Sequence, residues 1–302
     1  MGLVGKIEPN CAPKWNKSRI ATQEKEWDLG EFTIAEELCY KDFNATLVQH
    51  SLRKKTSVAD MTGGDFLNIV VEPTLQAALD KMLWRLYWFG DKQAKNVEDG
   101  GIITDGIDPE FFHVADGFFK RLEAITSANP AQRVTIAANT AASYVDQRED
   151  IKADGVATKI FDELIYSADI KLRQASDRVV LCTQSYADAL AIDVKRTIGS
   201  DLQWEAMLDG MAYATRFNGE QIIALPRWDE MIMAFEDDGT ILNKPHRVLY
   251  ASKGTLWAGI ASENTISEVD VFFDKKTRSN HILAVDEIGT LVWEDGLIQS
   301  AY

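Results

Sequence analysis

The last quarter of the chain most constrains the fold, because it consists of short strand-like runs separated by turns. Residues 225–229 suit a helical turn, and Asp238-Gly239 suits a tight turn that needs a positive φ. The runs that follow are rich in β-branched and aromatic residues, which is typical of strands. They occupy residues 245–251, 256–260, 269–273, 281–285 and 289–293. We expect them to form one β platform.

The composition fits a large globular chain. Of 302 residues, 46% are apolar and 26% are charged, which excludes a disordered chain and favours one large or two intertwined domains. The net charge of -15 argues against sequence-independent binding of duplex DNA, since such binding needs Lys and Arg to displace the counterions of phosphates.

The cysteines and the N-terminus predict a reducing compartment. Cys11, Cys39 and Cys182 are widely separated and include no Cys-x-x-Cys pair, so neither a disulfide framework nor a zinc site is indicated. No apolar run suits a signal peptide or approaches the roughly 18 residues of a membrane span. We expect synthesis and residence in a cytoplasm.

The N-terminal third begins with an extended arm. Residues 1–32 show neither a helical nor a strand periodicity for long, so the arm has no core of its own. Trp15 and Trp27 must therefore find apolar surface on the chain's own body or on a neighbouring subunit. Thr33 and Glu36 form a capping-box pattern that predicts an amphipathic helix from Thr33. The basic run Arg53, Lys54 and Lys55 suits the end of that helix, and a hairpin-like loop is expected around Gly63-Gly64.

A long helix follows the loop. Glu72-Pro73 opens it, with proline at the first helical position, and Gly90 ends it. Trp84, Trp88 and Phe89 extend its apolar surface almost all the way round, which predicts a helix covered on most sides.

The middle of the chain alternates helices and strands, which gives an α+β fold. Asn218-Gly219 is the strongest hairpin signal, and Ser185 is expected to cap a helix. The other expected elements are helices at 108–127 and 154–175, the second being the longest regular helix, strands at 133–137 and 178–183, and a linker at 139–150.

Chemical motifs are weak throughout. Asp99, Asp105 and Asp108 lie in a Gly-rich loop that could hold a cation, although the EF-hand order is absent and Asp108 also suits a helix cap. The histidines show no zinc-helix spacing, and neither a nucleophile elbow nor a phosphate-binding glycine loop occurs. No catalytic, cofactor-binding or metal residues are therefore assigned. The histidines are His50, His113, His246 and His281.

The order of the elements resembles the major capsid proteins of tailed bacteriophages, the Hong Kong 97-like fold. The resemblance covers about residues 33–302 and is carried most by residues 179–190, which look like a strand followed by a helix of that family's axial domain, and by the strand pair at 245–259. Residues 88–91 and 116–120 are similar in particular to capsid proteins of phages or prophages of gut anaerobes.

The resemblance implies five segments. They are an N-terminal arm (1–32), a helix plus extended loop (33–72), a peripheral domain with a spine helix (73–149), an axial domain (150–225) and a β platform returning to the peripheral domain (226–302). It also implies a virion shell of hexamers and pentamers around double-stranded DNA, assembled in the host cytoplasm, with scaffold, portal or decoration proteins as further partners. Neither residue of the family's Lys–Asn crosslink can be matched here.

The aromatic candidates for subunit contacts are those whose apolar surface a monomer would leave in water. The basic run is a candidate because it could touch phosphate or an acidic neighbour. The candidates are Trp15, Trp27, Arg53, Lys54, Lys55, Trp84, Trp88 and Phe89. Two alternatives stay open: an encapsulin-like nanocompartment shell, and an acidic metal-dependent hydrolase that uses Asp99, Asp105 and Asp108.

Overall fold

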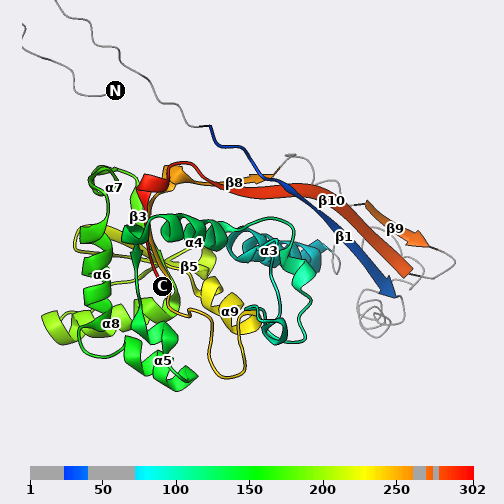
Figure 1. Cartoon of the computed structure of the whole chain (residues 1–302). Helices are drawn as coiled ribbons and strands as arrows, with labels where there is room; N and C mark the ends of the chain where they lie inside the picture. Colours follow the sequence, from blue (N-terminus) through cyan, green and yellow to red (C-terminus); the bar gives the residue numbers. More distant parts are fainter. Residues whose placement is uncertain (1–23, 40–71, 261–269, 275–278) are drawn as a thin grey trace, which may run out of the picture.

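Two β-sheets organise the residues that the computed structural model describes, which are 24–39, 72–260, 270–274 and 279–302. A seven-stranded sheet lies within the body, and a four-stranded sheet runs along the body and extends beyond it (Figure 1). The prediction of one β platform was wrong, because its strands are divided between these two sheets. Within these residues, no helix has both the length and the apolar character that crossing a membrane requires.

The seven-stranded sheet has the order β2-β11-β7-β3-β6-β5-β4. The pairs β3–β6 and β2–β11 are parallel, and the other pairs are antiparallel. Central β3 confirms the predicted buried strand, and β5 and β6 confirm the hairpin at Asn218-Gly219. The strands are β2 (Arg133–Val134), β3 (Arg178–Cys182), β4 (Glu205–Met207), β5 (Ala212–Phe217), β6 (Glu220–Ala224), β7 (Val248–Ser252) and β11 (Ile298–Ala301).

The four-stranded sheet is built on β10 (Ser279–Val292). This strand pairs with β1 (Gly30–Cys39) on one side, and with β8 (Leu256–Ile260) and β9 (Asp270–Asp274) on the other. All three pairings are antiparallel. The two strands predicted at 281–285 and 289–293 are therefore one continuous strand.

Helices pack on both sheets. The predicted long helix is α3 (Glu72–Phe89), and its Leu86 packs against Phe32 of β1 and Ile288 of β10. The other helices are α4 (Phe118–Ala128), α5 (Tyr144–Ile151), α6 (Val156–Ser167), α7 (Ile170–Gln174), α8 (Gln184–Ile198) and α9 (Pro226–Phe235).

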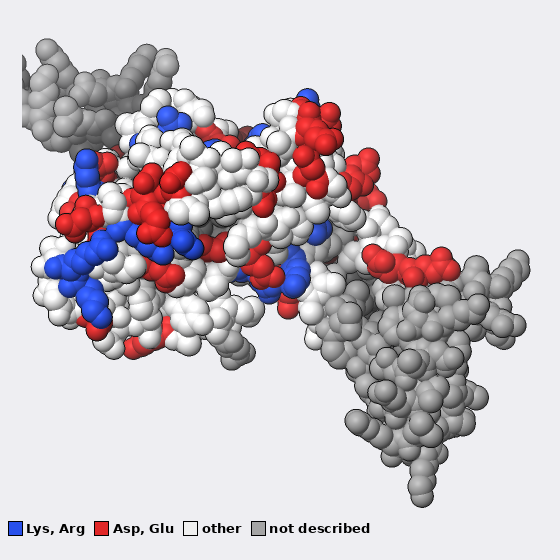
Figure 2. All heavy atoms as spheres, turned by 90° about the horizontal axis from the view of Figure 1, so that it is seen from below, with Lys and Arg blue, Asp and Glu red and all other residues white. Residues whose placement is uncertain are grey.

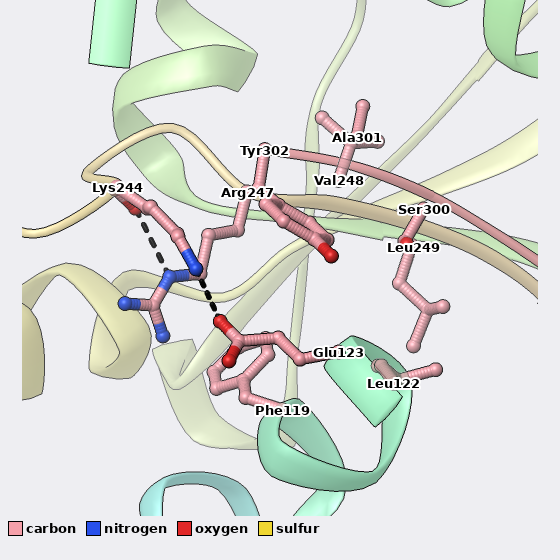
Figure 3. Close-up of a pocket in the computed structure, with 10 residues that line it drawn as sticks. All are labelled: Phe119, Leu122, Glu123, Lys244, Arg247, Val248, Leu249, Ser300, Ala301 and Tyr302. Atoms are coloured by element: carbon pink, nitrogen blue, oxygen red, sulfur yellow. Dashed lines mark hydrogen bonds and ion pairs between the residues drawn. The ribbon is translucent and has the colours of Figure 1, made fainter. Parts of the chain in front are cut away.

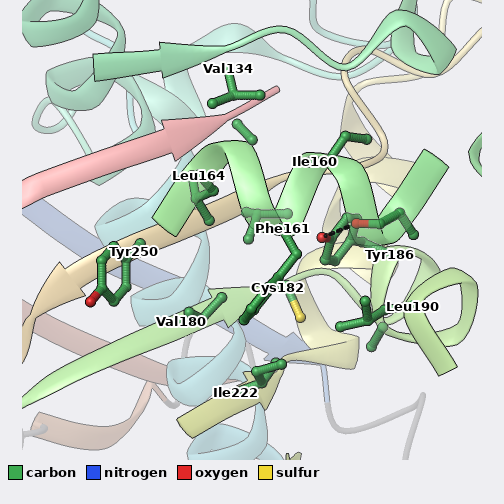
Figure 4. Close-up of a cluster of buried hydrophobic side chains, with 14 of the residues drawn as sticks. Val134, Ile160, Phe161, Leu164, Val180, Cys182, Tyr186, Leu190, Ile222 and Tyr250 are labelled. Carbon is green, nitrogen blue, oxygen red and sulfur yellow. Dashed lines mark hydrogen bonds between the residues drawn. The ribbon is translucent and has the colours of Figure 1, made fainter. Parts of the chain in front are cut away.

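The largest core lies between the seven-stranded sheet and helices α6 and α8. Phe161 and Leu164 of α6 meet Val180 of β3 and Ile222 of β6, and all four are fully buried (Figure 4). Tyr186 of α8 donates its hydroxyl to the Ala157 carbonyl at 2.9 Å, so its polar atom is satisfied inside the apolar core. Burial also raises the pKa of the Cys182 thiol, which keeps it protonated.

Two helices in this core are capped by carboxylates from distant segments. Buried Asp193 accepts from the backbone N–H groups of Gly155 (3.2 Å), Ala157 (2.9 Å) and Thr158 (3.2 Å) at the start of α6. Asp229 of α9 accepts from the N–H groups of Gln184 and Ser185 at the start of α8. The prediction that Ser185 caps this helix was wrong, since a carboxylate from another helix satisfies these donors.

The segment from Thr33 is a strand and not the predicted helix. Its apolar residues also alternate, and Phe32 and Ile34 lie together on the face that packs against α3. Pairing of all ten β1 residues with β10 outweighs the local capping-box signal. The rest of that predicted helix, with the extended loop, lies outside the described residues.

Three further predictions were wrong in their boundaries. The helix expected at 108–127 is split into a short 3-10 helix (Pro109–Phe112) and α4, because Gly117 passes close to Gly90 and bonds to its carbonyl at 2.8 Å. The helix expected at 154–175 is broken between α6 and α7, where the Asp169 carboxylate caps α7. It is therefore not the longest helix, since α3 is longer than either part. The linker expected at 139–150 contains α5, which Ser143 caps. The division into five segments remains a prediction.

Candidate functional site

The end of the arm lies in a notch on the four-stranded sheet. Gly259 of β8 and Gly289 of β10 are directly opposite each other, and neither has a side chain to occupy the surface above it. A Cβ at Gly259 would lie 2.9 Å from the Trp27 ring, and one at Gly289 would lie 2.9 Å from the Leu29 side chain and 2.8 Å from the Asp28 carbonyl. We call this pair the glycine notch; it lets the arm approach the strands closely.

Two lysines hold the same segment by charge. Lys25 Nζ donates to the Val292 carbonyl at 2.7 Å and lies 2.5 Å from the Asp295 carboxylate. Lys92 Nζ lies 2.6 Å from the Asp28 carboxylate. Exposed ion pairs contribute only about 0–1 kcal/mol each, so they set the path of the segment more than they stabilise it.

Three exposed indoles form a row beside the notch. Trp257 and Trp293 are stacked, with ring centroids 5.9 Å apart and ring planes at 26° to each other. Trp27 covers Gly259, which lies two residues after Trp257 on β8 and therefore on the same face of the strand. Trp257 Nε1 donates to the Gly254 carbonyl at 2.6 Å, which fixes its ring. The exposed fractions are 40% for Trp27, 48% for Trp257 and 55% for Trp293. We call these three residues the tryptophan row; it is a rigid aromatic surface left open to solvent.

The other arm and loop candidates cannot be placed. Trp15, Arg53, Lys54 and Lys55 lie outside the described residues, so their role in subunit contacts remains a prediction. Trp27 is placed, and it does find apolar surface on its own chain while keeping part of its ring exposed.

The three candidates on α3 lie in an aromatic cluster within the chain. The ring centroids of Trp88 and Trp228 of α9 are 4.5 Å apart in an edge-on arrangement, and those of Phe89 and Phe119 of α4 are 5.0 Å apart. Trp84 stacks on Trp88 at 6.5 Å and remains half-buried. The apolar surface that nearly surrounds this helix is therefore covered largely by the chain's own elements, and a contact role for these residues remains a prediction.

Sequence reasoning missed the glycine notch and the two other members of the tryptophan row. A signal was present, because a glycine inside a strand-like run often marks the close approach of another backbone. Gly259 and Gly289 both lie in such runs. Their pairing depends on strand register, which the runs alone did not define.

The acidic loop uses its carboxylates to bond backbone groups. Asp105 accepts from the Glu98 N–H at 3.1 Å, and Asp108 accepts from the Glu110 N–H at 2.9 Å, as expected of a helix cap. Across the described part of the chain, no three His, Cys, Asp or Glu side chains gather in a way that could hold a metal ion.

Ser185 and His246 form a polar pair that the sequence did not indicate. Ser185 Oγ lies 2.9 Å from His246 Nδ1, and His246 Nε2 lies 3.0 Å from the Gln147 carbonyl. Since a carbonyl only accepts, Nε2 carries the proton and the Ser185 hydroxyl donates to Nδ1. Burial lowers the pKa of His246 to about 4, so the ring is neutral. The group that accepts from Nε2 is a backbone carbonyl and not the carboxylate of a catalytic triad. The pair therefore serves to connect α8, α5 and the segment before β7.

A small pocket surrounds the C-terminal residue, Tyr302 (Figure 3). Lys244 pairs with Glu123 across it and lies 4.7 Å from the Tyr302 ring centroid, while Arg247 lies over Phe119 at 4.5 Å. Its volume of about 20 Å³ has room for roughly one water molecule, so it suits a structural junction better than a ligand site.

Acidic and basic side chains are mixed on the face shown in Figure 2. Lys and Arg lie next to Asp and Glu over the described part of this face, with no broad basic area. This pattern agrees with the net charge of -15 and gives little electrostatic attraction for phosphate backbones.

Comparison with known proteins gives a fold but no sequence family. No family model and no curated protein match the chain. Among solved structures, a chain of the satellite phage P4 procapsid with its size determination (Sid) protein superposes with a TM-score of 0.51 at 11% identity, over 100% of this chain and 86% of that one.

Two other matches are more distant. The Gordonia phage Cozz gives a TM-score of 0.46 at 10% identity, over 98% of this chain and 78% of that one. The SrpI encapsulin complex of Synechococcus elongatus gives 0.42 at 8% identity, over 90% and 73%. With its α+β architecture and its whole-length match to the P4 procapsid chain, this chain has the Hong Kong 97-like fold of phage capsid proteins.

Proposed function

We propose that the chain is a phage major capsid protein that self-assembles into the hexamers and pentamers of an icosahedral head around double-stranded DNA. The observation that carries the proposal is the match of the whole chain to a procapsid chain, with 86% of that chain covered in turn.

The exposed apolar residues support an assembly role. Leu283 and Val285 point outward from β10, where the four-stranded sheet extends from the body, and Trp27, Trp257 and Trp293 lie on the same sheet. A second group lies near the C-terminal end of α8 and the edge strand β4. This group comprises Ile198, Met207, Leu208 and Met211. Closed symmetric assembly buries such surface repeatedly, whereas a monomer would leave it in water.

The proposal assigns partners and location as well. The main partner is the chain itself, through Trp27 and the other predicted contact residues, with scaffold, portal or decoration proteins as further partners. The DNA is enclosed without specific binding, because the net charge of -15 gives an acidic container. The shell forms in the host cytoplasm and remains in the virion.

Light scattering of the purified full-length chain, followed by analysis of what its particles contain, tests this function. A phage head protein is expected to form capsomers or closed shells far above 33.8 kDa, and particles made with its phage partners should contain DNA. Shells that enclose a protein cargo and no DNA would indicate the encapsulin alternative. A monomer that depends on a divalent ion for hydrolysis would overturn the proposal.

A further inference from the structure

The tryptophan row is an exposed aromatic surface beside the first described residues of the arm. Its three indoles have exposed fractions of 40%, 48% and 55%, although tryptophan supplies more apolar area than any other side chain. The stack of Trp257 on Trp293 and the hydrogen bond from Trp257 to the Gly254 carbonyl hold the rings in place. A rigid surface of this kind binds a partner at little cost in conformational entropy.

The row lies among exposed carboxylates, with Lys171 and Lys253 as exposed cations in the neighbouring segments. Glu24, Glu26 and Glu294 are exposed in the segments that carry the row. Glu294 pairs with Lys171 at 3.8 Å, and its side chain remains 48% exposed. An occupant with lysine or arginine would gain ion pairs with these carboxylates, and cation–π contacts with the free indole faces.

Residues 1–23 have the matching chemistry. They lie outside the described residues, and their sequence contains four basic side chains and one acidic, against a chain that is strongly acidic as a whole. Residues 12–17 read Ala-Pro-Lys-Trp-Asn-Lys, which combines a proline, two cations and Trp15. Proline-containing segments dock on aromatic surfaces because their backbone is already extended and loses little entropy.

The attachment point places this segment beside the row. Lys25 is fixed to the Val292 carbonyl and to Asp295, the two residues that flank Glu294 and Trp293 in the sequence. Trp15 precedes Lys25 by ten residues, a length that spans up to about 35 Å when extended. Docking on the same chain is then intramolecular, with an effective concentration of about the millimolar range, and needs no second copy.

We propose that residues 1–23 dock on the tryptophan row of their own chain, with Trp15 against Trp257 and Trp293 and the lysines beside Glu294. This contact covers the row before the chain meets other copies. The docking itself is a property of the unassembled chain, so it stands or falls independently of shell formation.

Disulfide trapping in the full-length, unassembled chain tests the proposal, because Cys11 supplies a native thiol in the segment. The variant Glu294→Cys places a second thiol beside the row, and Glu163→Cys on α6 is the matched control, since the two glutamate side chains are 48% and 53% exposed. Cys39→Ser in both chains removes a competing thiol, and Cys182 is buried. A disulfide needs Cα atoms within about 7 Å, so fast trapping reports proximity.

The expected result is an intrachain disulfide that forms at least about tenfold faster with Glu294→Cys than with Glu163→Cys, at a rate unchanged by dilution. Adding Trp15→Ala or Trp257→Ala should slow it severalfold while circular dichroism stays the same. Equal rates of disulfide formation at the two positions would overturn the proposal. A rate that neither tryptophan substitution changes would also overturn it. Disulfides formed only between chains would assign the row to the arm of a second copy and also overturn it.

Discussion

The glycine notch predicts that Gly259→Val releases the arm segment and leaves the strand intact. A Cβ added at position 259 would lie 2.9 Å from the Trp27 ring, which is closer than real Cβ atoms approach other atoms, and valine adds two methyl groups beyond it. The indole must therefore leave the notch. Valine itself favours strand conformation, so the substitution should stabilise β8 locally while it displaces the arm.

The covered area of Trp27 gives the magnitude. A covered aromatic side chain buries about 150–250 Å², so Trp27, which is 40% exposed, buries on the order of 120 Å². At about 25 cal/mol per Å² this contact contributes at most about 3 kcal/mol. Its loss corresponds to roughly a hundredfold change in the ratio of docked to undocked arm.

Limited trypsin digestion at Lys25 measures that ratio, because cleavage requires the segment to leave the sheet. Gly259→Val should accelerate cleavage after Lys25 by about ten- to a hundredfold, while the rest of the chain stays as resistant to digestion as before. Gly296→Val is the matched control, since a Cβ at Gly296 meets nothing within 4 Å. Equal cleavage rates in the two variants would refute the notch, and general digestion of the Gly259→Val chain would show that the sheet itself needs the glycine.

Three further predictions follow from the buried groups and the charge. Asp193→Asn should lower the free energy of unfolding by about 1–3 kcal/mol, because it weakens the cap of α6, whereas exposed Asp162→Asn should have little effect in the same urea titration. The pKa of His246 is lowered from 6.5 to about 4 by burial, so the unfolded chain binds the proton first and stability falls as pH drops through this window. Between pH 7 and pH 5.5 the free energy of unfolding should fall by about 1 kcal/mol. The urea midpoint of His246→Gln should lack this decrease with pH, and an equal decrease in the variant would contradict the assignment. The free chain should not retard DNA in a gel at about 0.15 M salt, and tight binding there would contradict the acidic-container argument.

Local chemistry predicted the elements whose signals lie within a few residues. Proline at the start and Gly90 at the end marked α3, and Asn218-Gly219 marked the hairpin of β5 and β6. These features fix backbone angles directly, so tertiary context had little to change.

The errors occurred where a distant segment decides the outcome. Thr33 and Glu36 suit a helix cap in isolation, but β10 offers a complete ladder of backbone partners from more than two hundred residues away. Asp229 replaces Ser185 as a cap for the same kind of reason. The glycine notch needs the register of two strands that β10 brings together, and periodicity does not carry that information.

Negative-stain imaging of the assembled chain tests the central claim most directly, because it shows symmetry as well as mass. The proposed function predicts closed shells, or rings with fivefold and sixfold symmetry, when the full-length chain is produced with its phage partners. A chain that remains a 33.8 kDa monomer under those conditions, at every concentration, would contradict it.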